Sequence, residues 1–346
     1  MAKYIAKRIG YMLLVLLILS FLMYFVYNLI PTDRAAGDAR AEITASKNLK
    51  LDYDEIYAKY QRQYGTDGNL FIRYLRWLGL YPFSGVNEGD APYYNGLLQG
   101  NLGRSYVRGA DVLDVLIEPM KNTIFINIFA TIAALGITIP LGIFCAVKKG
   151  SRRDTAVQVF TIIGYSLPTF IIAILFIWIF VSNLNWFPAG GMSTIGASYT
   201  GMRAFGDKMY HLALPLIVMT FCSLGGMTRY VRASMIDALS MDCIRTARAK
   251  GVREKTVIYS HAFRNALIPI VTLVIGWFLG IFSGSIMIEN IFALNGIGRL
   301  YINSLNQSDF EVVLALQMFY VTISLAGNQL TDIVYGFVDP RIRVNA

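Results

Sequence analysis

The chain has 346 residues, of which 55% are hydrophobic and 15% are charged. This composition excludes an ordinary soluble enzyme of the same length and indicates a polytopic membrane protein. The net charge of +9 is interpreted below as a topology signal, and nucleic-acid binding is the less favoured interpretation.

Six long apolar runs predict six transmembrane helices, because each helix needs roughly 20 residues to cross about 30 Å of hydrocarbon. The third helix is expected to end near Ser182, and the fourth run gives the weakest prediction. In chain order the runs lie between residues 8 and 33, 121 and 148, 154 and 203, 211 and 229, 264 and 289, and 311 and 332.

The first run could instead be a cleaved signal peptide, since Lys3, Lys7 and Arg8 precede it. Its apolar stretch to Ile30 is longer than a signal core of about 7 to 15 residues, and no small-residue cleavage site interrupts it. We therefore expect residues 1–31 to form a cytosolic N-terminus and the first membrane helix.

Residues 32–121 are predicted to be an exported segment. The part from Asp33 to Lys121 carries eleven basic and twelve acidic residues, so it lacks the positive charge of a cytosolic loop. Amphipathic patterns predict helices over 52–63 and 70–80. The Gly, Pro, Asn and Tyr content predicts irregular backbone over 82–109. We expect a small cap packed against the membrane body.

Residues 122–338 are predicted to be a five-helix core with a cytosolic loop over 229–264. Glycines recur every four residues in the fifth span, which predicts one helix face that packs closely against another helix. These are Gly276, Gly280 and Gly284. Prolines in or beside spans two to five are expected to bend or break their helices. These are Pro140, Pro168, Pro215 and Pro269.

Lys and Arg are concentrated before the first helix, in the turn near residue 150, in the 229–264 loop and in residues 339–346. These segments are therefore expected to face the cytosol, together with both chain ends. Asp332 lies near the cytosolic end of the sixth span, four residues after Asn328. A structural role is favoured there over a coupling-ion or substrate role. Asn127 is left open between pathway lining and helix packing.

No arrangement of nucleophile, base and orienting acid is visible. His211 and His261 are predicted on opposite sides of the membrane, so they cannot share a metal or acid–base site. The three cysteines show no metal spacing or disulfide framework, and no P-loop pattern occurs. We therefore predict no catalytic, cofactor-binding or metal-binding residue, and ATP hydrolysis by this chain is not expected.

The 229–264 loop has a short helix predicted at its middle. Asp242 can cap a helix that begins near Cys243, Lys250 suits the C-terminal end of its dipole, and Gly251 supplies a left-handed end. About two helical turns are marginal in water, so we expect neighbouring helices and the groove of a partner to hold them. The expected docking residues are Arg245, Thr246, Ala247, Arg248, Ala249, Lys250 and Gly251.

These motifs resemble those of the transmembrane permease of a bacterial ATP-binding-cassette (ABC) importer, in the oligopeptide/dipeptide group. The loop is similar to the cytosolic loop that docks on the ATPase subunits, although residues 245–247 replace its Glu-Ala-Ala. Loop motifs are Arg232-Ala233-Ser234-Met235, residues 245–251, and His261 with residues 264–269. Elsewhere the matching motifs are Tyr64-Gly65, Arg73-Tyr74, residues 100–105, 289–292, 296–300 and 339–343. Residues 34–59 look longer than in typical members.

The resemblance implies an all-α, six-span, type I importer permease fold like that of the methionine importer, with an extended exported segment. It implies half of a heterodimeric pore for oligopeptides or dipeptides in the bacterial plasma (inner) membrane. Expected partners are a second homologous permease, two cytosolic ATPases that bind ATP and Mg²⁺, and an external substrate-binding protein. The chain itself would be non-catalytic, and residues 245–251 would act as a lever with Ala247 and Ala249 in the partner's groove and Arg245, Arg248 and Lys250 at its rim.

Other classes of transporter are left open by the sequence. A permease for nickel chelates, glutathione or another small solute shares the same loop. An ion-coupled secondary transporter would need midplane acids and inverted repeats, and a membrane-embedded hydrolase would need paired catalytic side chains at membrane depth. Neither pattern is visible.

Overall fold

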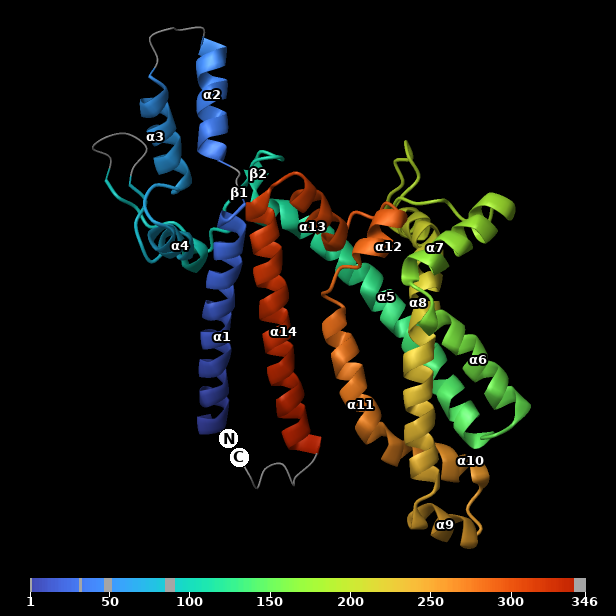
Figure 1. Ribbon diagram of the computed structural model, residues 1–346. Coiled ribbons are helices and arrows are strands. Elements are labelled where there is room, and N and C mark those ends of the chain that lie inside the picture. Colours follow the sequence, from blue (N-terminus) through green and yellow to red (C-terminus); the bar gives the residue numbers. More distant parts are fainter. Residues whose placement is uncertain (1, 31–32, 47–51, 85–90, 339–346) are drawn as a thin grey trace. The chain divides into compact units, whose positions relative to one another are not determined.

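A computed structural model describes residues 2–30, 33–46, 52–84 and 91–338. Contacts divide the chain into two compact units (Figure 1). The first consists of residues 1–117 with 303–322, and the second of residues 118–302 with 323–346. Each unit is built almost entirely from helices and is described on its own.

The first unit contains one long apolar helix and the shorter helices that follow it in the chain. Its elements are α1 (Ala2–Asn28), α2 (Arg34–Ser46), α3 (Tyr53–Tyr64), α4 (Leu70–Leu78), a 3-10 turn η1 (Leu97–Gln99), and an antiparallel hairpin of β1 (Arg104–Ser105) and β2 (Ala110–Asp111). The helices predicted over 52–63 and 70–80 are confirmed as α3 and α4. Helix α2 was not predicted.

The Arg73-Tyr74 motif joins α4 to α1. The Tyr74 hydroxyl lies 2.7 Å from Ser20 Oγ, and Arg73 Nη2 donates to Asn28 Oδ1 at 2.7 Å. Tyr24 packs in the same apolar cluster as Tyr74. The motif is thus explained by the attachment of α4 to the first membrane helix, α1.

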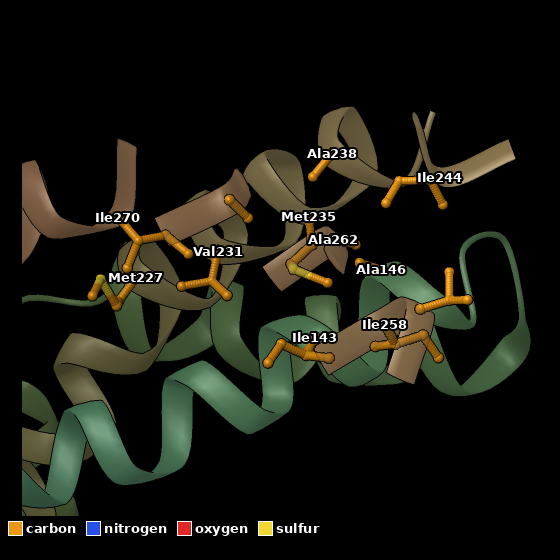
Figure 2. Close-up of a cluster of buried hydrophobic side chains, with 12 residues drawn as sticks. Ile143, Ala146, Met227, Val231, Met235, Ala238, Ile244, Ile258, Ala262 and Ile270 are labelled. Atoms are coloured by element: carbon orange, nitrogen blue, oxygen red, sulfur yellow. The ribbon is translucent and has the colours of Figure 1, made fainter. Parts of the chain in front are cut away.

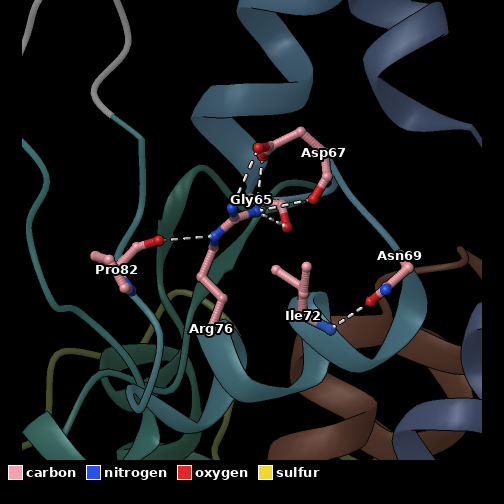
Figure 3. A network of polar contacts seen from close by, with 6 residues as sticks. All are labelled: Gly65, Asp67, Asn69, Ile72, Arg76 and Pro82. Atoms are coloured by element: carbon pink, nitrogen blue, oxygen red, sulfur yellow. Dashed lines mark hydrogen bonds and ion pairs between the residues drawn. The ribbon is translucent and has the colours of Figure 1, made fainter.

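Arg76 organises the turns on either side of α4 (Figure 3). Its side chain is 2% exposed, and Nη1 and Nη2 form a two-point ion pair with the Asp67 carboxylate at 2.7 and 3.1 Å. Nη1 also donates to the Gly65 carbonyl and Nε to the Pro82 carbonyl. Gly65 ends α3 at φ 66°, a conformation that favours glycine. One buried cation therefore fixes the Tyr64-Gly65 motif relative to α4.

The hairpin after η1 is tied to the start of the last helix, α14 (Phe310–Val338). Ser105 Oγ donates to Asp309 Oδ2 at 2.5 Å, and Arg108 Nη1 lies 3.3 Å from the same oxygen. Gly103, at φ 87°, would bring a Cβ within 2.9 Å of Glu311 Oε2. The glycine and serine of the 100–105 motif are therefore explained by this close approach.

The second unit contains the remaining membrane helices. Its elements are the main part of α5 (Val112–Val147), α6 (Arg152–Ser166), α7 (Thr169–Ile177), η2 (Trp178–Asn183), α8 (Gly201–Leu239), α9 (Asp242–Ala249), α10 (Glu254–Thr256), η3 (Val257–Ala262), α11 (Phe263–Gly280), α12 (Ile286–Ile291), most of α13 (Ile297–Asn306) and the end of α14.

Among the described residues, four helices are long and apolar enough to cross a membrane, and two bent helix pairs raise the number to six if each pair is one span. The predicted third span is broken by 103° between α6 and α7, at Pro168, and the fifth is bent by 55° at Pro269. Both prolines therefore have the expected effect. Pro140 and Pro215 lie inside α5 and α8, which continue through them as single helices.

The predicted glycine face of the fifth span is wrong. Helix α11 ends at Gly280, so Gly284 lies outside it. A Cβ on Gly276 or Gly280 would meet nothing within 4 Å, whereas Gly284 approaches the Gly298 backbone. The chain leaves the helix after Gly280 because Asn127 Nδ2 donates to the carbonyls of Ile281 and Ser283, at 2.9 and 2.8 Å. Asn127 thus has a packing role.

Candidate functional site

Helix α9 occupies the middle of the predicted 229–264 loop (Figure 1). It has eight residues, as expected from the sequence. The predicted N-cap is wrong, because Asp242 is already the first helical residue and Met241 precedes it without a side-chain cap. The Asp242 carboxylate instead lies 3.5 Å from Arg245 Nη1, which leaves it in the first turn, where a negative charge favours the helix dipole.

The end of α9 confirms the left-handed stop at Gly251, which has φ 73°. The Gly251 N–H donates to the Arg248 carbonyl at 3.0 Å, and the Val252 N–H donates to the Ala247 carbonyl at 3.2 Å. This pair of bonds is a Schellman motif, which satisfies the last carbonyls of a helix. Lys250 is the C-cap residue, and the helix therefore ends at one defined position.

One face of α9 is anchored in a cluster of buried side chains (Figure 2). Ile244 is fully buried in it, and Ala247 and Val252 pack against it. The other buried members come from α5, α8, η3 and α11. They are Ile143, Ala146, Met227, Val231, Met235, Ala238, Val257, Ile258, Ala262, Ala266 and Ile270. Residues of α5, α8, η3 and α11 thus pack in one cluster with α9, and packed cores resist deformation.

The opposite face of α9 is exposed. Arg245, Thr246, Arg248, Ala249 and Lys250 are all exposed, and Ala247 is half-buried. Of the two alanines expected in a partner's groove, Ala249 is free to be there, whereas Ala247 lies against the chain's own cluster. The docking role of residues 245–251 stays a prediction.

An exposed ion pair joins the two sides of the loop beyond α9. Arg248 Nη2 and Nε donate to the Glu254 carboxylate at 2.7 and 3.2 Å. Both side chains are exposed, so water and salt screen the pair and it contributes little to stability. Its effect is to orient the guanidinium rather than to hold the loop.

A second ion pair lies deeper, where α8 meets α6. Arg232 Nε and Nη2 donate to the two oxygens of Asp154 at 2.8 and 2.7 Å. Asp154 is 1% exposed, and it also accepts from the Gly150 N–H and from Gln158, both at 2.9 Å. Sequence reasoning missed this link, although Ser151 and Asp154 have the three-residue spacing of a helix N-terminal cap.

At the other end of the unit, Glu289 explains the 289–292 and 296–300 motifs. Its carboxylate is 3% exposed and accepts from Thr123 Oγ1 at 3.0 Å and from the Arg299 N–H at 2.9 Å. The Thr123 hydroxyl in turn accepts from the Ile297 N–H at 2.9 Å. A Cβ on Gly296 would lie 2.4 Å from the Glu289 carboxyl carbon. The carboxylate thus fixes the first turn of α13 against α5.

Replacing Glu289 with glutamine is expected to change the pH dependence of stability. Burial raises the pKa of the Glu289 carboxyl above its usual value of 4.5. A raised pKa means that the folded state binds the proton more tightly than the unfolded state does. Stability from this group is therefore present at low pH and is lost as pH rises through the folded-state pKa.

Thermal unfolding of the purified protein checks this prediction. Wild type should gain more in melting temperature than E289Q when the pH falls from about 7 to about 5. The exposed Glu254 serves as the control, and E254Q should follow wild type. Equal pH dependence of wild type and E289Q would contradict the prediction.

The remaining candidate residues from the sequence have structural surroundings or lie outside the described residues. His211 lies within 3.3 Å of Thr194 Oγ1 and of the Gly190 carbonyl, and His261 is exposed. No group of three metal-binding side chains occurs among the described residues. The side chain of Asp332 and all of residues 339–346 lie outside the described part.

Comparison with known proteins places these features in a family. Residues 138–344 match the family described as the binding-protein-dependent transport system inner membrane component. The chain belongs to this family. This inner-membrane permease is 33% identical over 346 residues to the oligopeptide transport system permease protein AppB of Bacillus subtilis (strain 168), covering 99% of both chains.

Another relative of this permease is the dipeptide transport system permease protein DppB of Lactococcus lactis subsp. cremoris (strain MG1363), 30% identical over 345 residues. That match covers 99% of this chain and 100% of the relative. Among solved structures, the MetNI methionine ABC transporter in inward-facing conformations is 15% identical, with a TM-score of 0.48 over 64% of this chain and 97% of the other. The family match, the full-length relatives and the apolar helices identify the permease as a multi-pass inner-membrane transport subunit.

Proposed function

We propose that this permease forms half of the pathway by which an ABC importer carries oligopeptides or dipeptides into the cell, and that α9 docks on an ATPase subunit. The peptide substrate is supported by the names of relatives that match the whole chain. The docking role rests on one observation: α9 is a short, defined helix that buries one face and exposes the other.

The packing around α9 suits the transmission of force. A push on the exposed face acts on Ile244, which is fully buried against α8 and η3. Arg232 passes the movement from α8 to α6 through its two hydrogen bonds to Asp154. ATP-driven closure of the ATPases therefore moves the cytosolic ends of several helices together, as alternation between inward-open and outward-open states requires.

We propose specific partners for this permease and a cytosolic location for both of its termini. The importer contains a second homologous permease, two cytosolic ATPases that bind ATP and Mg²⁺, and an external substrate-binding protein. Both termini of this chain are cytosolic, and the chain itself carries no catalytic residue or cofactor. The deciding test is uptake by the assembled complex in vesicles, with and without ATP, of peptides, nickel chelates and glutathione. Peptide uptake that depends on ATP supports the proposal, and uptake of only another solute contradicts it.

Labelling of Cys243 is expected to reveal the docking surface. The chain has three cysteines, of which Cys145 is buried, Cys222 is half-buried within α8, and Cys243 on α9 is exposed. A membrane-impermeant maleimide should therefore modify Cys243 alone, from the cytosolic side. Adding the ATPase subunits should slow this modification several-fold, because the docked face excludes the reagent. C243S serves as the control for specificity, and labelling from outside the cell or labelling unaffected by the ATPases contradicts the assignment.

A further inference from the structure

Lys208 lies near the end of α8 that is remote from α9. It is the eighth residue of a helix that begins at Gly201 and ends at Leu239, so about 46 Å of helix separates it from the cytosolic end at 1.5 Å per residue. With α9 facing the ATPases, Lys208 is at the exported end of the helix. Its side chain is half-buried there.

The hydrogen-bond acceptor of Lys208 and the ring nearest to it are neutral, and the Glu118 carboxylate acts on its charge without a hydrogen bond. The ammonium donates to Asn122 Oδ1 at 3.0 Å and lies 4.6 Å from the centroid of the Phe125 ring. A lysine ammonium has three donors, so two remain for another acceptor. The Glu118 carboxylate accepts from Asn295 Nδ2 at 3.3 Å instead. Because its one hydrogen-bond acceptor is neutral, this half-buried cation can still form a charge-assisted hydrogen bond with a bound anion.

Asn122 holds this cation in a fixed position. It is 9% exposed, and its Nδ2 donates to the Asn295 carbonyl at 3.0 Å. The amide therefore links α5 to the segment before α13 while its oxygen faces the ammonium. Positions fixed in this way lose little freedom when a ligand binds, which improves affinity and selectivity.

An aromatic surface adjoins the cation. Phe125 lies 4.8 Å from Phe129 and 6.3 Å from Phe205, between ring centroids. Phe205 is 45% exposed, so part of this surface is open. A ligand that binds both the ammonium and the aromatic surface carries a carboxylate next to an apolar side chain.

We propose that Lys208, supported by Asn122 and flanked by Phe125 and Phe205, binds the C-terminal carboxylate of the peptide at the outer end of the pathway. The proposal rests on the peptide-import function and adds a specificity-determining residue to it. A main-chain carboxylate is common to all free peptides, so this contact selects peptides without selecting their sequence. The phenylalanine rings accept the adjacent side chain.

The test compares two peptides of the same sequence, one with a free C-terminal carboxylate and one with a C-terminal amide. Uptake is measured with the complete transporter, its binding protein and ATP in proteoliposomes. K208M should lower uptake of the free acid about tenfold, because a charge-assisted hydrogen bond is lost, and should leave uptake of the amide unchanged. K208R should keep the preference for the free acid. The same binding protein is used with every variant. Its own preference between the two peptides therefore cancels when uptake by a variant is compared with uptake by wild type.

A second measurement uses only the free-acid peptide, so it remains valid if the binding protein does not bind the peptide with a C-terminal amide. Benzoylphenylalanine is placed at position 205, and cross-linking to the free-acid peptide is recorded during transport. The cross-link should form and should fall about tenfold in K208M. K121M is the matched control, since Lys121 is exposed and adjacent to Asn122, and it should behave as wild type. An unchanged cross-link in K208M would overturn the proposal.

Anionic lipid offers the same ammonium a phosphate, so the uptake assay is repeated in vesicles made only of phosphatidylcholine. The difference between wild type and K208M should persist there. Its disappearance would assign Lys208 to lipid and overturn the proposal, as would an equal loss for both peptides, which indicates a structural role. Failure of the import function itself is distinct, because wild type would then take up neither peptide.

Discussion

Replacing Ala247 with arginine is expected to abolish ATP-driven uptake and to uncouple ATP hydrolysis, while the protein still inserts into the membrane. Ala247 packs against the cluster that anchors α9, and a long charged side chain at that position forces the helix away from its support. Gly251→Pro should have the same effect, because proline cannot adopt φ 73° and removes the N–H that bonds to Arg248.

Uptake and ATPase activity of the reconstituted complex check this prediction, together with the amount of each variant in the membrane. Ala249→Arg is the matched control for helix position, because Ala249 is exposed. In the isolated permease A249R should keep the wild-type melting temperature, and A247R should lower it. Normal peptide uptake by A247R or G251P would refute the role of α9 as a lever.

Replacing Arg232 with alanine is expected to destabilise the permease by about 3 to 5 kcal/mol, because it leaves a buried carboxylate unpaired. That carboxylate belongs to Asp154, which is 1% exposed. The double variant R232M/D154L should recover much of the lost stability, since apolar replacements of a buried pair are often neutral. Uptake should remain low in the double variant, because the polar link between α8 and α6 is lost.

Denaturant or thermal unfolding of R232M, D154L and the double variant R232M/D154L gives the coupling energy between the two side chains, and R232A is measured beside them. Arg248→Ala is the matched control, because the ion pair with Glu254 is exposed and should contribute little to stability. A stability loss in R232A no greater than that in R248A would contradict the prediction.

Hydropathy located the membrane helices because a continuous apolar run long enough to cross a bilayer is rare in soluble proteins. Local chemistry also located α9 and its end at Gly251. A left-handed helix end favours glycine, and Gly251 has φ 73°. The start of α9 was placed one residue late, because an aspartate favours the first helical turn as well as the cap. An aspartate stabilises a helix by similar amounts at these two neighbouring positions.

Features that depend on distant partners were not visible in the sequence. Helix α11 ends at Gly280, where Asn127, far away in the chain, binds the carbonyls that follow. The glycine spacing alone therefore predicted a helix that continues too far. The pair of Arg232 and Asp154 joins residues 78 positions apart. Lys208 and Asn122 likewise meet only in the folded chain. A single sequence contains these residues but not their pairing.

The break at Pro168 divides the third span into two arms. One arm, α6, is tied to α8 by Asp154, and the other arm, α7, contributes Ile172 and Ala173 to a separate cluster with Phe292. Helix α8 runs beside both as one uninterrupted rod of 39 residues. The continuous helix α8 thus packs against a neighbour that is broken at Pro168. A rotation of the whole of α8 can therefore be accommodated by a change of angle between α6 and α7.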